Sequence, residues 1–171
     1  FVESAADRGL MSDADLSGNG AVFGDVDGDG DVDLYVSYHY GATNELYMND
    51  GSGNFTEEGA ARGVADGGNG RGVAFGDVDG DGDLDMLPSR AAATPYVVIY
   101  ENDGLGNFPE YGNILTDYNF NRPVRAPLYG ALNGDELIDI FLPNIDAKYF
   151  FGILQSTFSY FIHIQRLSLD W

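Results

Sequence analysis

The sequence contains no cysteine, and this absence excludes disulfide bonds, thiolate metal sites and a cysteine nucleophile. Only two histidines are present, His39 and His163, which leaves few options for a zinc site or a histidine base. Outside the aspartate-rich loops described below, no nucleophile with a neighbouring base and no carboxylate pair stands out. We therefore assign no catalytic residue and no organic cofactor.

Basic side chains are scarce too: eight lysines and arginines stand against 28 aspartates and glutamates, for a formal net charge of −20. Such a charge repels phosphate groups, so we expect neither nucleic acid nor anionic lipid as a partner. The acidic residues are not evenly spread, because five lie in residues 25–33 and five in residues 77–85. Clustering of this kind indicates a bound cation rather than a general solubility device.

Long hydrophobic runs are missing as well. The one extended apolar stretch, residues 149–164, is interrupted by Gln155, Ser159 and His163 and is too short for a membrane-spanning helix. We expect this stretch to form sheet, and we predict no membrane insertion. The chain opens at Phe1 without a charged and apolar leader, and we interpret this start as a cut.

What the sequence does contain is a repeat. Residues 21–34 return as residues 73–86, both with the run Phe-Gly-Asp-Val-Asp-Gly-Asp-Gly-Asp, and residues 46–55 return as residues 99–108. A third, divergent copy covers residues 128–140. The copies are spaced by about 53 residues, and a period of this length indicates a repeat architecture.

Within one period the pattern predicts four short strands. Residues 72–76 and 84–88 are expected to form two strands on either side of an acidic loop, and residues 96–100, rich in β-branched and aromatic side chains, a third. An Asn-Asp-Gly turn precedes the fourth predicted strand, at residues 108–111. No stretch shows sustained helical periodicity.

Four strands every fifty or so residues is the size of a β-propeller blade. We predict an all-β fold of about three four-stranded antiparallel blades, in a partial or open propeller. A β-helix repeats in far shorter units, and an EF-hand array needs flanking helices, so both fit worse. The chain is treated as one repeat region, residues 1–171, with blades at about 20–58, 72–111 and 126–165, and with residues 1–4 as the outer strand of a preceding or closing blade.

The aspartates of each acidic loop stand at every second position. Like charges about 4 Å apart repel by roughly 1 kcal/mol even in water, so the loops favour a counter-ion. Ca²⁺ suits them because it takes about six to eight oxygen ligands, and Gly30 and Gly82 at the sixth loop position permit the tight turn. The twelfth-position Glu of an EF-hand is absent, so Asp33 and Asp85 at the ninth position are expected to close the shell.

The pattern Asp-x-Asp-x-Asp-Gly-x-x-Asp after a Phe-Gly pair resembles the FG-GAP, or VCBS, repeat of integrin α-subunits, some fungal lectins and many bacterial secreted proteins. The resemblance covers roughly residues 1–146. It implies side-chain ligands at loop positions one, three, five and nine and a carbonyl ligand at position seven. These positions are Asp25, Asp27, Asp29, Asp33 and Asp31 in the first loop, and Asp77, Asp79, Asp81, Asp85 and Asp83 in the second.

The third copy departs from this pattern. Ala131 replaces the first aspartate, Asn133 the second, and Glu136 the turn glycine. The remaining candidate ligands are Asn133, Asp135 and Asp139, and we expect weak calcium binding or none there.

The resemblance implies an extracellular module, secreted or on the cell surface, that binds calcium and recognises a protein or glycan or serves as a scaffold. The alternative is a fragment of a secreted propeller enzyme that acts on polysaccharide. Three blades fall short of the four to eight of closed propellers, so we expect self-association or the remainder of a longer propeller chain. The identity of the ligand does not follow from the sequence.

Overall fold

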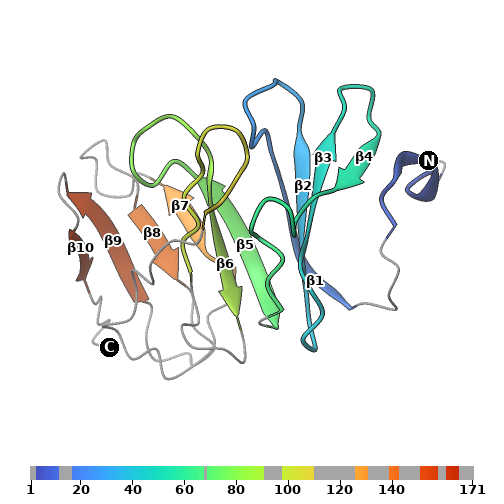
Figure 1. The fold of residues 1–171 in the computed structure, drawn as a ribbon. Helices are drawn as coiled ribbons and strands as arrows, with labels where there is room; N and C mark the ends of the chain where they lie inside the picture. Colours follow the sequence, from blue (N-terminus) through green and yellow to red (C-terminus); the bar gives the residue numbers. More distant parts are fainter. Residues whose placement is uncertain are drawn as a thin grey trace.

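The computed structural model describes residues 3–11, 17–67, 69–90, 98–109, 126–130, 139–142, 151–157 and 161–165. In these residues it is built from antiparallel strands and a single short 3-10 turn, η1 (Ala6–Arg8), so the all-β prediction is confirmed. None of the described helical structure is long and apolar enough to cross a membrane. The strands form three sheets that lie side by side (Figure 1).

The first sheet, which we call blade 1, has four strands in sequence order. All neighbouring pairs are antiparallel, as predicted, and the first acidic loop joins the first two strands. Its strands are β1 (Gly18–Gly24), β2 (Asp33–Tyr38), β3 (Glu45–Asn49) and β4 (Phe55–Glu57).

The second sheet, blade 2, consists of β5 (Gly70–Gly76) and β6 (Asp85–Arg90), with the second acidic loop between them. Both strands match the prediction to within a few residues. The predicted third strand is present as a single antiparallel bridge from Tyr100 to Met86, and residues 91–97 lie outside the described residues. Of the predicted fourth strand, residues 108–109 are not in a strand, and residues 110–111 lie outside the described part.

The third sheet, blade 3, is four-stranded with the order β10-β9-β8-β7. The apolar stretch near the end of the chain therefore supplies two strands, as expected for sheet. The strands are β7 (Leu128–Gly130), β8 (Asp139–Leu142), β9 (Phe151–Thr157) and β10 (Phe161–Gln165).

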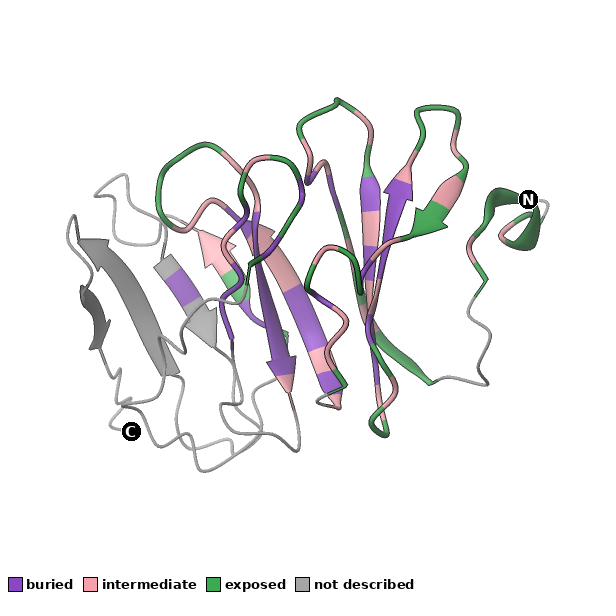
Figure 2. Ribbon diagram, viewed as in Figure 1, coloured by how far each residue is buried: buried purple, intermediate pink, exposed green. Residues whose placement is uncertain are grey.

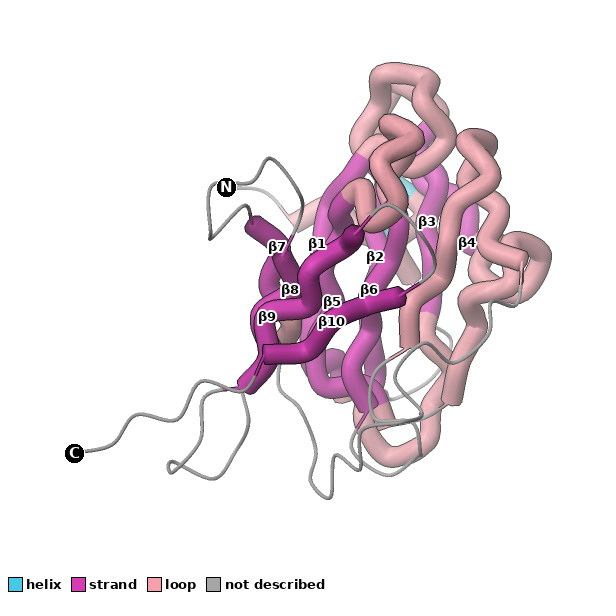
Figure 3. The backbone as a smooth tube through the Cα atoms, turned by 90° about the vertical axis from the view of Figure 1, so that its left-hand side faces the viewer, coloured by secondary structure: helices cyan, strands magenta, loops and turns pink. Residues whose placement is uncertain are grey.

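Small residues let the first strands of successive blades approach closely. A Cβ atom on Gly20 would lie 3.0 Å from the Cα atom of Gly72, and one on Gly72 would lie 2.5 Å from the Cα atom of Ala126. Strand β5 accordingly packs against β1 on one side and against β7 on the other. Viewed from the side of blade 3, the strands of the three sheets lie one behind another (Figure 3).

The main core lies between blades 1 and 2 (Figure 2). Tyr35 and Leu46 from blade 1 and Met86 and Phe108 from the second repeat are fully buried, together with Val64 from the connection between the blades. Each such side chain stabilises the fold by about 1.5–3 kcal/mol through removal of apolar surface from water. Blades 1 and 2 therefore share one hydrophobic core.

Asn102 adds a polar link across this interface. Its amide nitrogen donates to the carbonyl of Val26 in the first acidic loop at 2.6 Å and to that of Leu84 at 3.1 Å, and its side-chain oxygen accepts from the backbone of Gly104 and Gly106. Asn49, at the same repeat position in blade 1, bonds only within its own blade.

We expect Asn102→Ala to destabilise the chain by about 2–4 kcal/mol, because buried backbone groups lose their partners. Asn49→Ala is the matched control and is expected to cost about 1 kcal/mol, since its side-chain bonds are exposed. Urea denaturation of the two variants measures the difference. Equal losses of unfolding free energy would show that the contact between Asn102 and Val26 does not stabilise the interface between the blades.

Candidate metal centre

The first acidic loop, residues 25–33, leaves β1 and enters β2. Gly28 and Gly30 have φ angles of 72° and 94°, in the left-handed region that other residues rarely adopt. No atom lies near the place where a Cβ on either glycine would stand, so backbone conformation and not space requires glycine here. The two turns fold the loop back on itself and bring alternate aspartates together.

Three carboxylates converge in this loop: oxygens of Asp25, Asp27 and Asp29 all lie within 4.8 Å of one another. One oxygen of Asp25 accepts a hydrogen bond from the backbone of Gly30 at 2.9 Å. The other oxygen, Oδ1, is buried without a hydrogen-bond donor, and so is Oδ1 of Asp27. Buried carboxylate oxygens without donors are rare and unfavourable, and a divalent cation is the partner that would satisfy both.

The second loop, residues 77–85, repeats the fold with Gly80 and Gly82 at φ angles of 83° and 102°. Here the oxygens that lie within 4.8 Å of one another belong to Asp77, Asp79 and Asp85. Asp77 accepts from the backbone of Gly80 at 2.7 Å and of Gly82 at 3.1 Å. Its carboxylate therefore stabilises the turns of the loop through two backbone hydrogen bonds.

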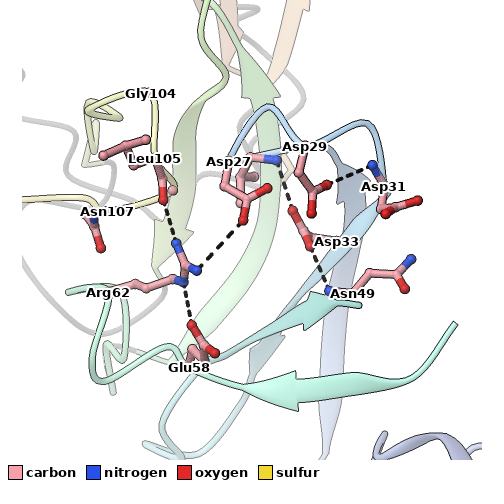
Figure 4. Close-up of polar contacts among 12 residues, drawn as sticks. Asp27, Asp29, Asp31, Asp33, Asn49, Glu58, Arg62, Gly104, Leu105 and Asn107 are labelled. Carbon is pink, nitrogen blue, oxygen red and sulfur yellow. Dashed lines mark hydrogen bonds and ion pairs between the residues drawn. The ribbon is translucent and has the colours of Figure 1, made fainter. Parts of the chain in front are cut away.

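The ninth loop position has a structural task in both loops. Both oxygens of Asp33 accept backbone hydrogen bonds, from Val26 at 3.0 Å and from Asn49 at 2.9 Å (Figure 4). Asp85 does the same with Val78 at 2.6 Å and Asn102 at 2.9 Å. Asp33 thus ties the start of its loop to the last residue of β3, and Asp85 ties the start of its loop to a residue just after the bridge at Tyr100.

Burial and mutual repulsion disfavour the ionised form of three of these carboxyl groups. Burial raises the pKa of Asp85 to about 7, with a further upward push from the charges of Asp79 and Asp81, against the backbone hydrogen bonds that lower it. Burial likewise raises the pKa of Asp33 and that of Asp79. A bound cation would remove this penalty by holding the carboxylates in the ionised form.

The two loops thus assemble different subsets of the predicted ligands. Asp33 is not grouped with the first cluster, and Asp81 is not grouped with the second. The side chains of Asp31 and Asp83 lie against Gly51 and Gly104 of the following hairpins, away from both clusters. In the third copy, Asn133 and Asp135 lie outside the described residues, and for Asp139 only the backbone is described, at the start of β8.

Arg62 also belongs to this region and was not among the predicted site residues. Its guanidinium donates to the carbonyl of Leu105 at 2.7 Å, pairs with Glu58 at 2.8 Å and lies 3.8 Å from Asp27 (Figure 4). The signal was present, because Arg8 precedes Arg62 by one period of 54 residues. An arginine that recurs with the period of the repeat indicates a structural contact.

Comparison with known proteins agrees with the loop pattern. A family model described as an FG-GAP-like repeat matches residues 25–87, a stretch that includes both acidic loops. No curated protein matches the chain at a significant level.

Proposed function

Because a family model described as an FG-GAP-like repeat matches residues 25–87, we propose that this propeller-type chain is an extracellular module that binds two calcium ions and recognises a protein or a glycan. The observation that carries the calcium proposal is the pair of buried Oδ1 atoms, on Asp25 and Asp27, that have no hydrogen-bond donor. The second loop supports it with the converging oxygens of Asp77, Asp79 and Asp85.

Calcium would act here as a structural element. In each loop it would neutralise carboxylates that repel one another and fix the connection between the first two strands of a blade. Both loops lie at the same end of the sheets (Figure 1), so the ions would stiffen one end of the module. The hairpins after the third strand position gather at this end too, and loops held on a rigid scaffold are the usual place of recognition.

An extracellular location suits such sites, because modules outside the cell meet calcium at concentrations that fill sites with dissociation constants of about 10⁻⁴–10⁻³ M. FG-GAP-like repeats are typical of extracellular proteins. The formal net charge of −20 also favours a partner without phosphate groups, such as a neutral glycan or a protein with basic side chains.

We expect titration calorimetry to find two calcium ions per chain. Asp25→Asn should remove one of them: the new amide oxygen can still accept from Gly30, while the amide NH₂ would face the cation. Asp7→Asn is the matched control, since it removes the same charge from the exposed turn η1. Two ions bound to Asp25→Asn, or none bound to the unaltered chain, would contradict the proposal.

The recognition proposal is tested separately, on a glycan array and a panel of cell-surface proteins, each with calcium and with chelator. We expect binding that calcium strengthens and no turnover. Cleavage of polysaccharides by the chain would instead favour the propeller enzyme, and binding that chelator leaves unchanged would separate recognition from the acidic loops.

A further inference from the structure

Blades 1 and 2 meet through a glycine that two apolar side chains cover. A Cβ atom on Gly24, at the end of β1, would lie 2.8 Å from Phe75 and 3.0 Å from Leu84 of blade 2. The same arrangement recurs one blade later, where a Cβ on Gly76 would lie 2.6 Å from Tyr129. In each case the aromatic residue of one repeat lies on the glycine of the preceding repeat.

A polar contact accompanies this apolar one. Arg62, on the connection that leads into blade 2, binds the carbonyl of Leu105 in the hairpin of the second repeat and lies 3.8 Å from Asp27 in the acidic loop of blade 1 (Figure 4). Its side chain is only 15% exposed. The interface between the blades therefore includes an ion pair to the aspartate at the third loop position of the preceding blade.

The side of blade 1 that faces away from blade 2 carries the same three residues, and the described part of the chain places no second blade against them. Phe23 and Val32, 52 positions before Phe75 and Leu84, are 63% and 49% exposed. Arg8 donates to the carbonyl of Ser52 at 2.8 Å, which is the hairpin contact of Arg62 one period earlier. Among the described residues no carboxylate forms an ion pair with the exposed Arg8.

We propose that this surface, made by Phe23, Val32 and Arg8, docks one further blade with an intact acidic loop. Phe23 and Val32 would cover the glycine that ends its first strand. Arg8 would pair with the aspartate at the third position of its loop. The inference is independent of calcium binding and of any recognised glycan or protein, because it rests on the repeated interface alone.

The chain's own repeats do not supply this partner. Gly24 and Gly76 are already covered by Phe75 and Tyr129. In the third repeat the residue at the third loop position is Asn133, which carries no charge for Arg8. A second copy of the chain therefore offers no uncovered blade with this aspartate, and a blade of another origin with an intact loop is the occupant that the charges favour.

The docking contact is centred on the end of the blade that holds the acidic loop. Towards the other end, Glu45 stands where the second repeat has the buried Val98, and its carboxylate accepts from the hydroxyls of Tyr38 at 2.6 Å and Tyr47 at 2.7 Å. At this end of the face the polar groups of Glu45, Tyr38 and Tyr47 already have hydrogen-bond partners. Phe23, Val32 and Arg8 therefore carry the apolar and charged parts of the proposed contact.

The absence of cysteine makes a direct test possible. Val32→Cys introduces a single thiol in the proposed contact and leaves Phe23 and Arg8 intact. The docked blade is supplied by fusing a second copy of residues 1–54, one full period, ahead of Phe1 of the complete chain, with Val32→Cys in the original copy only. The rate of thiol modification by a maleimide is then compared between the extended and the original chain.

Docking is expected to slow modification of this thiol at least about tenfold, the factor that corresponds to about 1.4 kcal/mol. Tyr40→Cys in the original copy, at an 82% exposed loop position, is the control and should react equally in both chains. Asp27→Asn in the added copy should restore much of the reactivity of the thiol introduced by Val32→Cys. Equal reactivity in both chains would overturn the proposal, and so would protection in the original chain that grows with its concentration, since a second copy would then be the partner.

Discussion

Removal of calcium is expected to lower the melting temperature of the chain by about 10–20 °C. A site filled at a hundred times its dissociation constant stabilises the folded state by about 2.7 kcal/mol, so two sites contribute about 5 kcal/mol. For a chain of 171 residues, each kcal/mol corresponds to about 2–4 °C. The effect arises from the converging carboxylates of the two loops, which repel one another when no cation is present.

Scanning calorimetry in excess calcium and in excess chelator measures this shift. The double variant Asp25→Asn with Asp77→Asn should lose most of it, because each loop then lacks one converging carboxylate. Asp7→Asn should keep it. Magnesium is a second control, since its smaller, octahedral shell suits these loops less well, and it should produce a smaller rise. Melting temperatures that agree in calcium and chelator would rule out the calcium proposal.

The loops themselves could be predicted from the sequence because their chemistry is local. Five aspartates at alternate positions and a glycine at the sixth create repulsion and a turn within nine residues, and no distant contact is needed to see this. The strands on either side, β1 with β2 and β5 with β6, followed from the same local pattern. The structure places both loops between the strands expected to flank them.

The role of the ninth position could not be predicted in the same way. Asp33 binds the backbone of Asn49, and Asp85 that of Asn102, and each partner comes from a hairpin 16 or 17 residues further along the chain. The link from Arg62 to Asp27 crosses between two blades. Such contacts depend on how strands and blades pack, and a single sequence shows them only as residues that recur with the period.

The second large effect is expected from Asp33→Ala and from Asp85→Ala, each in the presence of chelator. Both changes leave two backbone N–H groups without acceptors, at Val26 and Asn49 or at Val78 and Asn102. A buried group that loses its partner costs about 1–3 kcal/mol, so the pair costs about 2–6 kcal/mol. Relief of the burial penalty that raises the pKa of these carboxyl groups offsets part of this, and we expect a net loss of about 3 kcal/mol.

Urea denaturation in chelator separates this structural task from ligation of the ion. Asp29→Ala is the control, because Asp29 belongs to the first cluster but is exposed and accepts only from its neighbour Asp31. Without calcium it should lose less than about 1 kcal/mol, as surface substitutions away from a buried network do. With calcium, the unfolding free energy of Asp29→Ala should differ more from that of the unaltered chain, because the variant lacks a proposed calcium ligand. If Asp33→Ala and Asp29→Ala were equally stable in chelator, the two hydrogen bonds of Asp33 would not hold the loop, and its carboxylate would matter only through the ion.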